Sequence, residues 1–464
     1  MSLIIPANTL ASGGYQVANS CRFDGTSAYL SRTQGTPTDV DKYTISVWFK
    51  RSALFNGAYQ NIIGTDHQSV REAIRFNDDA DSLTWDFKNA SNTKSNITPN
   101  QLFRDVAAWY HLVCIFDSAN GTANLRRRIF LNGTEITSFA AVTYNAQNED
   151  GNLNKGGQNI VIGIPAAANN FFSGYMSEFV FVDGQALTPD GNFGEFDEDS
   201  GIWKPIDVSG LTFGNNGFYL DFEDSGDLGD DESGNGNDFA ETNLAAIDQS
   251  TDTCTNNFAT LNVLNKGTSV SLSEGNLAYT APSGSFASVL STIGFSQGKW
   301  YAEYQWKSGS NSHVGIGKEN INYNHYLSYT ANGYSYYKDG RKFNNSSASS
   351  YGNSYAVDDI IGVALDLDNG AIWFSKNGTW QNSATLTEIQ NGTTTNAAFT
   401  SLSGEFFFGT GMGNSNELAY FNFGSPPYSE SGGETDGNGY GNFAHAVPSG
   451  FLSLNTKNLS EVLG

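Results

Sequence analysis

The sequence predicts an all-β protein made of two antiparallel β-sandwich (jelly-roll) domains in tandem. Two stretches, Trp109–Ile136 and Ile360–Gln381, each spell an apolar strand, an aspartate-led Asn-Gly turn, a second strand and an Asn-Gly-Thr turn. Asn-Gly supplies the positive φ values that a two-residue hairpin turn requires. Glycine is abundant (51 of 464 residues) and charged residues are few (16%), which favours short strands and tight turns over long solvated helices. A chain of this length suits two domains of about 150 to 200 residues each.

The N-terminal region is expected to form a short docking segment, residues 1–20, followed by the first sandwich at residues 21–195. Short apolar/polar alternations recur there at roughly ten-residue spacing, as a sandwich requires. In one of them Ile45, Val47 and Phe49 share a face, which we expect to point into the core because side chains alternate along a strand.

The order of motifs in this first region identifies its fold more closely. The strands S-V-W-F-K and W-Y-H-L-V, the hairpin R-I-F-L-N-G-T and the closing phrase G-x-M-S-E-F-x-x-x-D-G-x-x-L-T (Gly174–Thr188) follow one another. Together they resemble the laminin-G-like, concanavalin-like jelly roll, and the resemblance implies a bent two-sheet sandwich.

Residues 196–255 are expected to form a connector rich in Gly, Asp and Asn. Within it Asp231, Ser233, Asn235 and Asn237 place oxygen-bearing side chains at alternate positions, like the first half of an EF-hand calcium loop. The twelfth position of such a loop would be Thr242 and not a bidentate glutamate. The same residues also form Asx turns readily, so bound calcium and a plain turn both stay open, and no other cofactor is expected.

The second sandwich is expected at residues 256–425. It opens with G-K-W-Y-A-E, continues through V-G-I-G and D-D-I-I-G-V-A-L-D-L-D, and reaches F-S-K-N-G. These phrases, in this order, resemble a SPRY domain. Ile361, Val363, Leu365 and Leu367 alternate and should face its core. Residues 426–464 are expected to be a Gly-rich linker and a C-terminal tail that forms one more strand or a docking segment.

A loop region rich in tyrosine and asparagine, Asn320–Tyr337, is the candidate ligand site of the second sandwich. Tyrosine offers an apolar face with a polar tip and asparagine both donates and accepts hydrogen bonds, which suits sugars or a short peptide. The resemblance to SPRY domains implies that inter-strand loops build the ligand surface. The alternative is that tyrosines such as Tyr334 and Tyr336 simply pack on a strand face. The residues singled out as ligand contacts are Tyr323, His325, Tyr326 and Tyr329.

Catalysis is not predicted. Retaining glycoside hydrolysis needs two carboxyl groups about 5 Å apart, and the strand motif E-x-D-x-E that supplies them in laminarinase-type jelly rolls is missing. Glu178 has only Asp183 near it, five positions away and therefore on the opposite strand face, so a structural or solvent-facing Glu178 is expected. The five histidines show no zinc spacing, and no nucleophile elbow follows a strand.

Charge and cysteine usage limit the partners. With 48 acidic and 24 basic residues the formal charge is −24, so most of the surface repels a phosphate-rich partner and nucleic acid is not expected. The basic run Arg126–Arg128 is interpreted as the wet face of an edge strand. Cys114, within L-V-C-I-F, is expected to be buried and unpaired. Neither a signal peptide nor a membrane span is expected.

The combination of domains resembles structural and adhesion proteins of tailed phages. The phrases N-S-C-R-F-D-G-T-S-A-Y-L-S-R-T, S-V-W-F-K-R-S and T-N-N-F-A-T-L-N carry this resemblance. It implies a protein of the virion surface, a tail or head fibre or a decoration protein, that displays loops toward host-surface glycan. Other virion proteins would be its partners and it would form a homo-oligomer, with a trimer as one option. Two alternatives remain: a polysaccharide-degrading, tailspike-like enzyme, and a purely architectural capsid protein.

Overall fold

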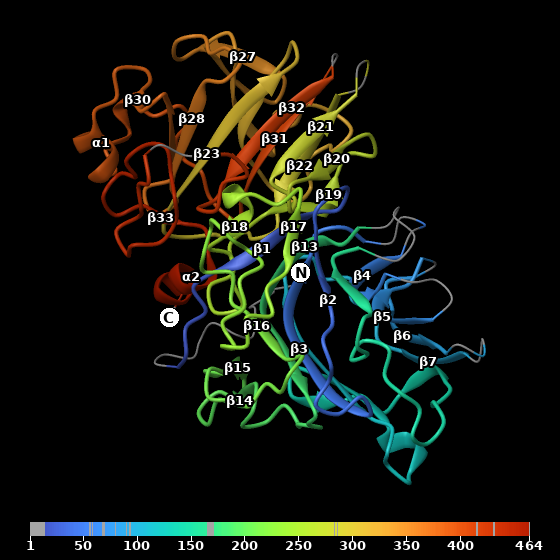
Figure 1. The fold of residues 1–464 in the computed structure, drawn as a ribbon. Helices are drawn as coiled ribbons and strands as arrows, with labels where there is room; N and C mark the ends of the chain where they lie inside the picture. Colours follow the sequence, from blue (N-terminus) through green and yellow to red (C-terminus); the bar gives the residue numbers. More distant parts are fainter. Residues whose placement is uncertain are drawn as a thin grey trace. The chain divides into compact units, whose positions relative to one another are not determined.

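The computed structural model describes residues 14–54, 57, 59–66, 70–78, 80–89, 91, 94–164, 171–282, 284, 286–413, 416–429 and 432–463. The chain divides into two compact units, and the boundary between them in the sequence lies between Asn256 and Asn257. Each unit is built on two large, mainly antiparallel sheets, which confirms the predicted all-β class (Figure 1). Most of the predicted docking segment, residues 1–13, lies outside the described residues.

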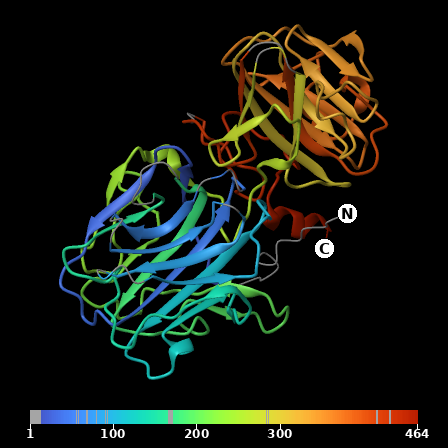
Figure 2. The ribbon, with the colours of Figure 1, turned by 90° about the vertical axis from the view of Figure 1, so that its right-hand side faces the viewer.

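The first unit contains two eight-stranded sheets (Figure 2). One sheet runs in the order β10 (Thr134–Glu135), β9 (Arg127–Leu131), β8 (Trp109–Asp117), β3 (Lys42–Arg51), β13 (Ser173–Asp183), β1 (Ser20–Asp24) and β18 (Gln249–Ser250), with β16 (Phe218–Leu220) paired to β13. The other runs β11 (Phe139–Val142), β7 (Lys94–Pro99), β6 (Leu83–Lys88), β5 (Arg71–Phe76), β4 (Gln60–Thr65), β12 (Asn159–Ile162), β2 (Tyr29–Thr33) and β17 (Ala240–Thr242). A separate hairpin joins β14 (Gly194–Phe196) to β15 (Trp203–Pro205), and two short 3₁₀ helices are η1 (Ala123–Leu125) and η2 (Ala246–Asp248).

The main core of this unit lies between its two sheets. Ile45, Val47 and Phe49 of β3 are fully buried in it, as predicted. The opposite face of β3 is buried as well, since Trp48 stacks on His111 (ring centroids 4.6 Å apart) and His111 stacks in turn on Trp203 (5.8 Å). A second apolar layer therefore covers the outside of this sheet.

That outer layer comes largely from the segment expected to be a connector. Residues 196–255 contribute β15, β16, β17 and β18, and Trp203, Val208 and Phe213 are buried. The Nε1 of Trp203 donates to Nδ1 of His111 at 2.8 Å. The abundant Gly, Asp and Asn of this segment form its turns, and the few apolar residues between them anchor it to the sheet.

Arg127 corrects the interpretation of the basic run as a wet edge. Its side chain is 1% exposed and donates to the carbonyl oxygens of Trp85 (3.1 Å) and Thr143 (3.0 Å). The wet-edge interpretation was wrong for this residue because its side chain shares the core-facing side of β9 with Ile129 and lies over the rings of Trp85 and Phe87. Cys114 is buried and unpaired, as predicted.

The second unit contains the seven-stranded sheet β19 (Leu261–Lys266), β22 (Phe286–Ser291), β31 (Phe407–Gly413), β24 (His313–Gly317), β25 (Gly333–Tyr337), β26 (Arg341–Asn344) and β27 (Ser347–Ser350). Its other sheet is β20 (Ser271–Ser273), β21 (Ala278–Ala281), β32 (Glu417–Asn422), β23 (Lys299–Ser308), β28 (Ile360–Asp366), β29 (Ala371–Lys376) and β30 (Thr379–Trp380), with β33 (Leu452–Ser453) added parallel to β23. The helices are short: α1 (Leu386–Gln390), α2 (Thr456–Leu463) and the 3₁₀ turn η3 (Thr394–Asn396). Ile361, Val363 and Leu365 are fully buried, as predicted.

The C-terminal segment expected as linker and tail is ordered against this unit. The buried carboxylate of Asp436 accepts hydrogen bonds from the backbone N and Oγ of Ser453 (2.9 and 2.6 Å) and from Nδ2 of Asn458 (2.7 Å). Buried Glu303 of β23 accepts from the backbone N–H groups of Ala444 and His445 (2.9 Å each). Glu303 thus ties the segment to β23, and Asp436 ties two parts of the segment to each other.

Both predicted meanders form, as β8–β9–β10 and β28–β29–β30. Their second turns have positive φ at both central residues, Asn132 (46°) and Gly133 (76°) in one and Asn377 (47°) and Gly378 (75°) in the other, as a two-residue hairpin turn requires. The first turns differ from this pattern. The connection in the earlier meander is long enough to contain η1, and the later one joins Asp366 to Ala371 with positive φ at Gly370 (64°) but not at Asn369.

Candidate functional site

The loop between β24 and β25, residues 318–332, lies flat on the outer face of the seven-stranded sheet. Tyr323 O accepts a hydrogen bond from the backbone N of Ser288 at 2.8 Å, and Ser288 Oγ donates to the carbonyl oxygen of His325. A Cβ added to Gly411 of β31 would stand 2.4 Å from the backbone nitrogen of Leu327. The loop backbone can therefore approach the strand only because that position is glycine.

Three rings form a continuous stack on this loop. The His325 ring lies between Phe286 of β22 (centroids 5.3 Å apart, planes 6° apart) and Tyr329 (3.4 Å, 11°). We call Phe286, His325 and Tyr329 the aromatic stack. Its outer members are exposed, Phe286 by 37% and Tyr329 by 39%, so large apolar ring surface faces solvent.

Tyr326 joins the aromatic stack to the sheet beneath it. Its ring lies edge-on to His325 and Tyr329 and parallel to His313 of β24 (centroids 4.9 Å apart). His313 is 5% exposed and is packed by Phe343 on another side. A second layer of rings therefore supports the exposed ones and fixes their orientation.

The histidines of this cluster are uncharged near neutral pH. Burial lowers the pKa of His313 from its ordinary value to about 3, and burial also lowers the pKa of His325. A neutral imidazole stacks on phenyl and phenol rings without the desolvation cost of a buried cation. The aromatic stack thus presents an apolar surface without charge of its own.

The structure brings together three of the four residues singled out from the sequence, His325, Tyr326 and Tyr329. The fourth, Tyr323, packs on a separate cluster formed by Leu290 and neighbouring apolar residues, and its Oη donates to the carbonyl oxygen of Glu319 at 2.8 Å. It supports the loop and does not belong to the exposed surface of the aromatic stack.

The alternative reading holds for the tyrosines of β25. Tyr336 is fully buried in the core of this unit, and Tyr334 packs against the same core. Sequence reasoning missed Phe286, which lies about forty positions before the loop. The available signal was the alternation of Phe286 with buried Ala287 and Val289, which places a large aromatic side chain on the outer face of a strand.

The candidate calcium residues of the first unit are engaged in a hydrogen-bonded turn. Asp231 Oδ1 accepts from the backbone N of Tyr219 and of Ser233 (2.9 Å each), and Oδ2 accepts from Ser233 Oγ and Asn237 N (2.8 Å each). Asn235 and Asn237 turn their amide nitrogens inward and donate to backbone carbonyls, including that of Gly217. Donor groups occupy the positions from which a cation would need oxygens, so these residues fit an Asx turn better than a calcium ion.

Across the residues that the structure describes, no group of three or more His, Cys, Asp or Glu side chains is placed to hold a metal ion. In the same part of the chain no helix has the length and apolar character needed to cross a membrane.

Glu178 lies at a β-bulge of β13 with φ of 49°, and the pairing register with β3 shifts between Ser177 and Val180. Its side chain is 5% exposed and accepts a hydrogen bond from Tyr219 Oη at 2.9 Å. Burial raises the pKa of this carboxyl to about 8. Asp183 bonds instead to the backbone N of Thr38 and of Asn216, so these two acids do not face a common substrate position. Glu178 is therefore an enclosed structural acid and not a solvent-facing one.

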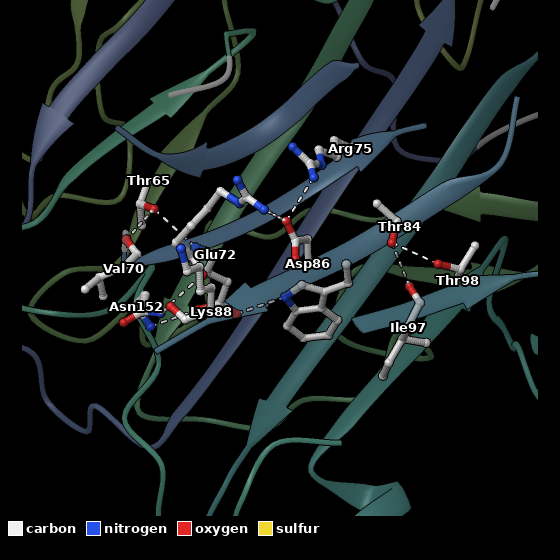
Figure 3. Close-up of polar contacts among 12 residues, drawn as sticks. Thr65, Val70, Glu72, Arg75, Thr84, Asp86, Lys88, Ile97, Thr98 and Asn152 are labelled. Atoms are coloured by element: carbon white, nitrogen blue, oxygen red, sulfur yellow. Dashed lines mark hydrogen bonds and ion pairs between the residues drawn. The ribbon is translucent and has the colours of Figure 1, made fainter. Parts of the chain in front are cut away.

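A second enclosed acid lies at the inner face of β5 (Figure 3). Glu72 is fully buried and accepts hydrogen bonds from Trp85 Nε1 (2.9 Å) and from the backbone N of Asn152 (2.8 Å) and Leu153 (3.1 Å), as well as from Tyr43 Oη. Burial raises the pKa of this carboxyl above its ordinary value. All of these partners are protein groups, so Glu72 ties the loop at Asn152 to the core.

Comparison with known families identifies both domains. Residues 24–191 match the model of the concanavalin A-like lectin/glucanases superfamily (Laminin_G_3), and residues 299–426 match the SPRY domain model. The chain thus carries a laminin-G-like, concanavalin-type jelly roll followed by a SPRY domain. This pair of domains indicates a binding role.

Solved structures similar to parts of the chain include the SPRY domain of human HERC1, at 18% identity over 35% of this chain and 96% of that one, with a TM-score of 0.29. A heptameric SAP-like pentraxin from Limulus polyphemus is also similar, at 18% identity over 38% of this chain and 80% of that one, with a TM-score of 0.27. No curated protein matches the chain.

Proposed function

We propose that this chain is a glycan-binding adhesion protein of the tailed-phage virion surface, part of a tail or head fibre or a decoration protein. The observation that carries the glycan part is the aromatic stack, whose members Phe286 and Tyr329 are more than one third exposed. Large exposed apolar ring faces mark interaction sites. The C–H face of a sugar ring is an apolar surface of matching size and shape for such a face.

Polar groups around the stack supply the directional contacts that a sugar requires. Tyr326 Oη donates to Ser346 Oγ (3.1 Å), which in turn donates to the carbonyl oxygen of Tyr329 (2.9 Å). The exposed side chains of Asn324 and Asn345 add amide donors and acceptors nearby in the chain. An uncharged ring surface with hydroxyl and amide groups at its rim favours a neutral sugar over a charged one.

The virion assignment rests on the resemblance of the N-terminal and inter-domain phrases to tailed-phage particle proteins. Under this proposal other virion proteins and sister copies of the chain are its partners, and host-surface glycan is its ligand. We propose no catalytic role, in keeping with the enclosed positions of Glu72 and Glu178.

The test is a glycan array with the full chain, followed by titration of the bound neutral glycan with the variant Y329A. Loss of half of the exposed ring surface is expected to weaken binding at least tenfold. The matched control is Y420A, which removes a partly buried tyrosine from β32 in the other sheet of the same unit, and this variant is expected to bind like the parent. Equal binding by Y329A and the parent would contradict the assignment of the site.

Two outcomes would favour the alternatives. Silence on the array together with tight association with particles indicates an architectural capsid protein. Release of reducing ends from algal or bacterial polysaccharide indicates a tailspike-like enzyme.

A further inference from the structure

We propose that the outer face of strands β5, β6 and β7 in the first unit binds an acidic polysaccharide, one that carries carboxylate or sulfate groups. This site lies in a different unit from the aromatic stack and takes a ligand of different chemistry, so it goes beyond the function proposed above. We call it the cationic face. Its charged residues are Arg71, Arg75, Lys88, Lys94 and Asp86.

The pairing register places these side chains on one face. Ile74 and Phe76 of β5 and Trp85 and Phe87 of β6 point into the core, so the residues that alternate with them point outward. Across the strands, Arg71 pairs with Lys88 and Lys88 pairs with Lys94. One cross-strand row therefore consists of three cations in succession.

A row of like charges directly opposite one another destabilises a sheet. Among the described residues, the carboxylate paired with these cations is that of Asp86, whose Oδ2 accepts from Arg75 Nη2 at 2.9 Å (Figure 3). It is also paired with Arg71. Asp78 adds a second negative charge near Arg75. Four cations against two carboxylates leave a local excess of positive charge in a chain whose formal charge is −24. A bound anion would balance this local excess of positive charge.

The cationic face has an accessible rim and a buried floor. Lys94 is exposed and Lys88 partly exposed, whereas the side chains of Arg71, Arg75 and Asp86 are 25%, 10% and 11% exposed. The two lysines and the exposed part of Arg71 are therefore the cations that a ligand can reach, and a carboxylate or sulfate oxygen is the acceptor that a guanidinium binds best.

Neighbouring polar groups favour a polysaccharide over nucleic acid. Thr84 and Thr98, paired hydroxyls 2.9 Å apart, share this face with exposed Asn96 and can bond to sugar hydroxyls. The Tyr59 ring, the kind of ring on which a base stacks, already lies under the Arg75 guanidinium, 3.8 Å from its centroid. The large negative charge of the whole chain opposes a partner as densely charged as nucleic acid. Cations repeated from strand to strand at about 4.8 Å suit acidic groups repeated along a sugar chain.

The experiment titrates the full chain at low salt with alginate, which carries carboxylates, with dextran sulfate, and with neutral dextran. Binding of either acidic polymer, weakened by added NaCl and absent with dextran, is the expected result, and the two polymers distinguish carboxylate from sulfate. The variant K88Q/K94Q should bind the acidic polymer at least tenfold more weakly and with a shallower salt dependence. K88R/K94R should keep the binding of the parent.

The matched control is R104Q/K155Q, which removes two exposed cations from loops of the same unit and should bind within twofold of the parent. The thermal midpoints of all variants are measured, so that a folding defect is recognised. If K88Q/K94Q has such a defect, the binding of K88R/K94R tests whether positive charge at these positions is what the polymer requires. Binding of neither acidic polymer, or equal binding by K88Q/K94Q, would overturn the proposal. Equal affinity for a single-stranded oligodeoxynucleotide would replace it with nucleic acid binding. The variant Y329A should retain acidic-polymer binding, so failure of the aromatic site and failure of the cationic face are separate results.

Discussion

The enclosed acid at the bulge of β13 predicts a measurable pH dependence of stability. Burial is the main cause that raises the pKa of Glu178 to about 8, with the negative charges of Asp221 and Glu223 adding to it and the hydrogen bonds from Tyr219 and Tyr15 opposing it. The reference pKa for this carboxyl is 4.5. The folded protein therefore holds the Glu178 proton more tightly than the unfolded chain does.

The sign and size of the effect follow from linkage. Because the folded pKa is raised, the stabilisation from the protonated acid is fully present below about pH 4.5 and is lost as the pH rises through about 8. Each pKa unit corresponds to about 1.4 kcal/mol, so the full range amounts to roughly 5 kcal/mol before local relaxation is considered. Between these limits the free energy of unfolding contributed by this residue falls with every unit of pH.

The variant E178Q isolates this contribution because glutamine keeps the shape of the side chain without a titrating proton. Its stability relative to the parent should rise by several kcal/mol between pH 5 and pH 8.5, measured by calorimetry or urea unfolding of the full chain. Glu303, whose pKa burial raises to about 7 in the second unit, titrates equally in both proteins and cancels from the difference. The control E198Q alters an exposed acid of the first unit. A constant difference between E178Q and the parent across this pH range would refute the reasoning.

Three further predictions concern the turn, the loop and a buried cation. Removal of calcium with EGTA should leave the thermal midpoint of the protein unchanged, because the turn at residues 231–238 satisfies its own carboxylate with N–H and O–H donors; a drop of several degrees would show a bound ion. G411A should lift the loop off β31, lower stability by about 1 to 3 kcal/mol and weaken neutral-glycan binding, whereas G437A, whose added Cβ meets nothing within 4 Å, should do neither. R127M should lower the free energy of unfolding by about 1 to 3 kcal/mol for each of the two carbonyl oxygens, of Trp85 and Thr143, that lose their donor; urea unfolding that matches the parent would contradict a structural role for this arginine.

The strands could be predicted from the sequence because they depend on local signals. Alternation in β3 and β28 named the buried faces correctly, and the turns at Asn132 and Asn377 adopt the positive φ values that Asn-Gly permits. What the sequence concealed depends on contacts between distant segments. Arg127 looked like a surface cation because nothing in its own strand shows that the carbonyl oxygens of Trp85 and Thr143 accept its hydrogen bonds.

The connector illustrates a second limit of prediction from sequence. Amino-acid composition indicates turns more clearly than it indicates the few buried side chains that fix a segment to the core. Gly, Asp and Asn dominate residues 196–255, yet the position of the segment is set by a few apolar side chains such as Trp203, whose ring packs on Gly133 so closely that an added Cβ would stand 2.4 Å from it. The bulge at Glu178 has a similar effect on the strand pattern, because one inserted residue lets Met176 and Phe179 both reach the core.

The two proposed binding surfaces differ in how far they could be predicted from the sequence. Tyr326 and Tyr329 lie close together in the chain, so the sequence predicts a tyrosine-rich site there. It does not predict Phe286, the partner that the fold adds to the aromatic stack. The cationic face gave no such signal, since Arg71, Lys88 and Lys94 are scattered singly among apolar strand residues and become neighbours only through the register of β5, β6 and β7. A net charge of −24 describes the average surface and conceals this local reversal. Because the register makes Arg71, Lys88 and Lys94 direct neighbours, the register itself is the reason to propose a polyanion as the ligand of this row.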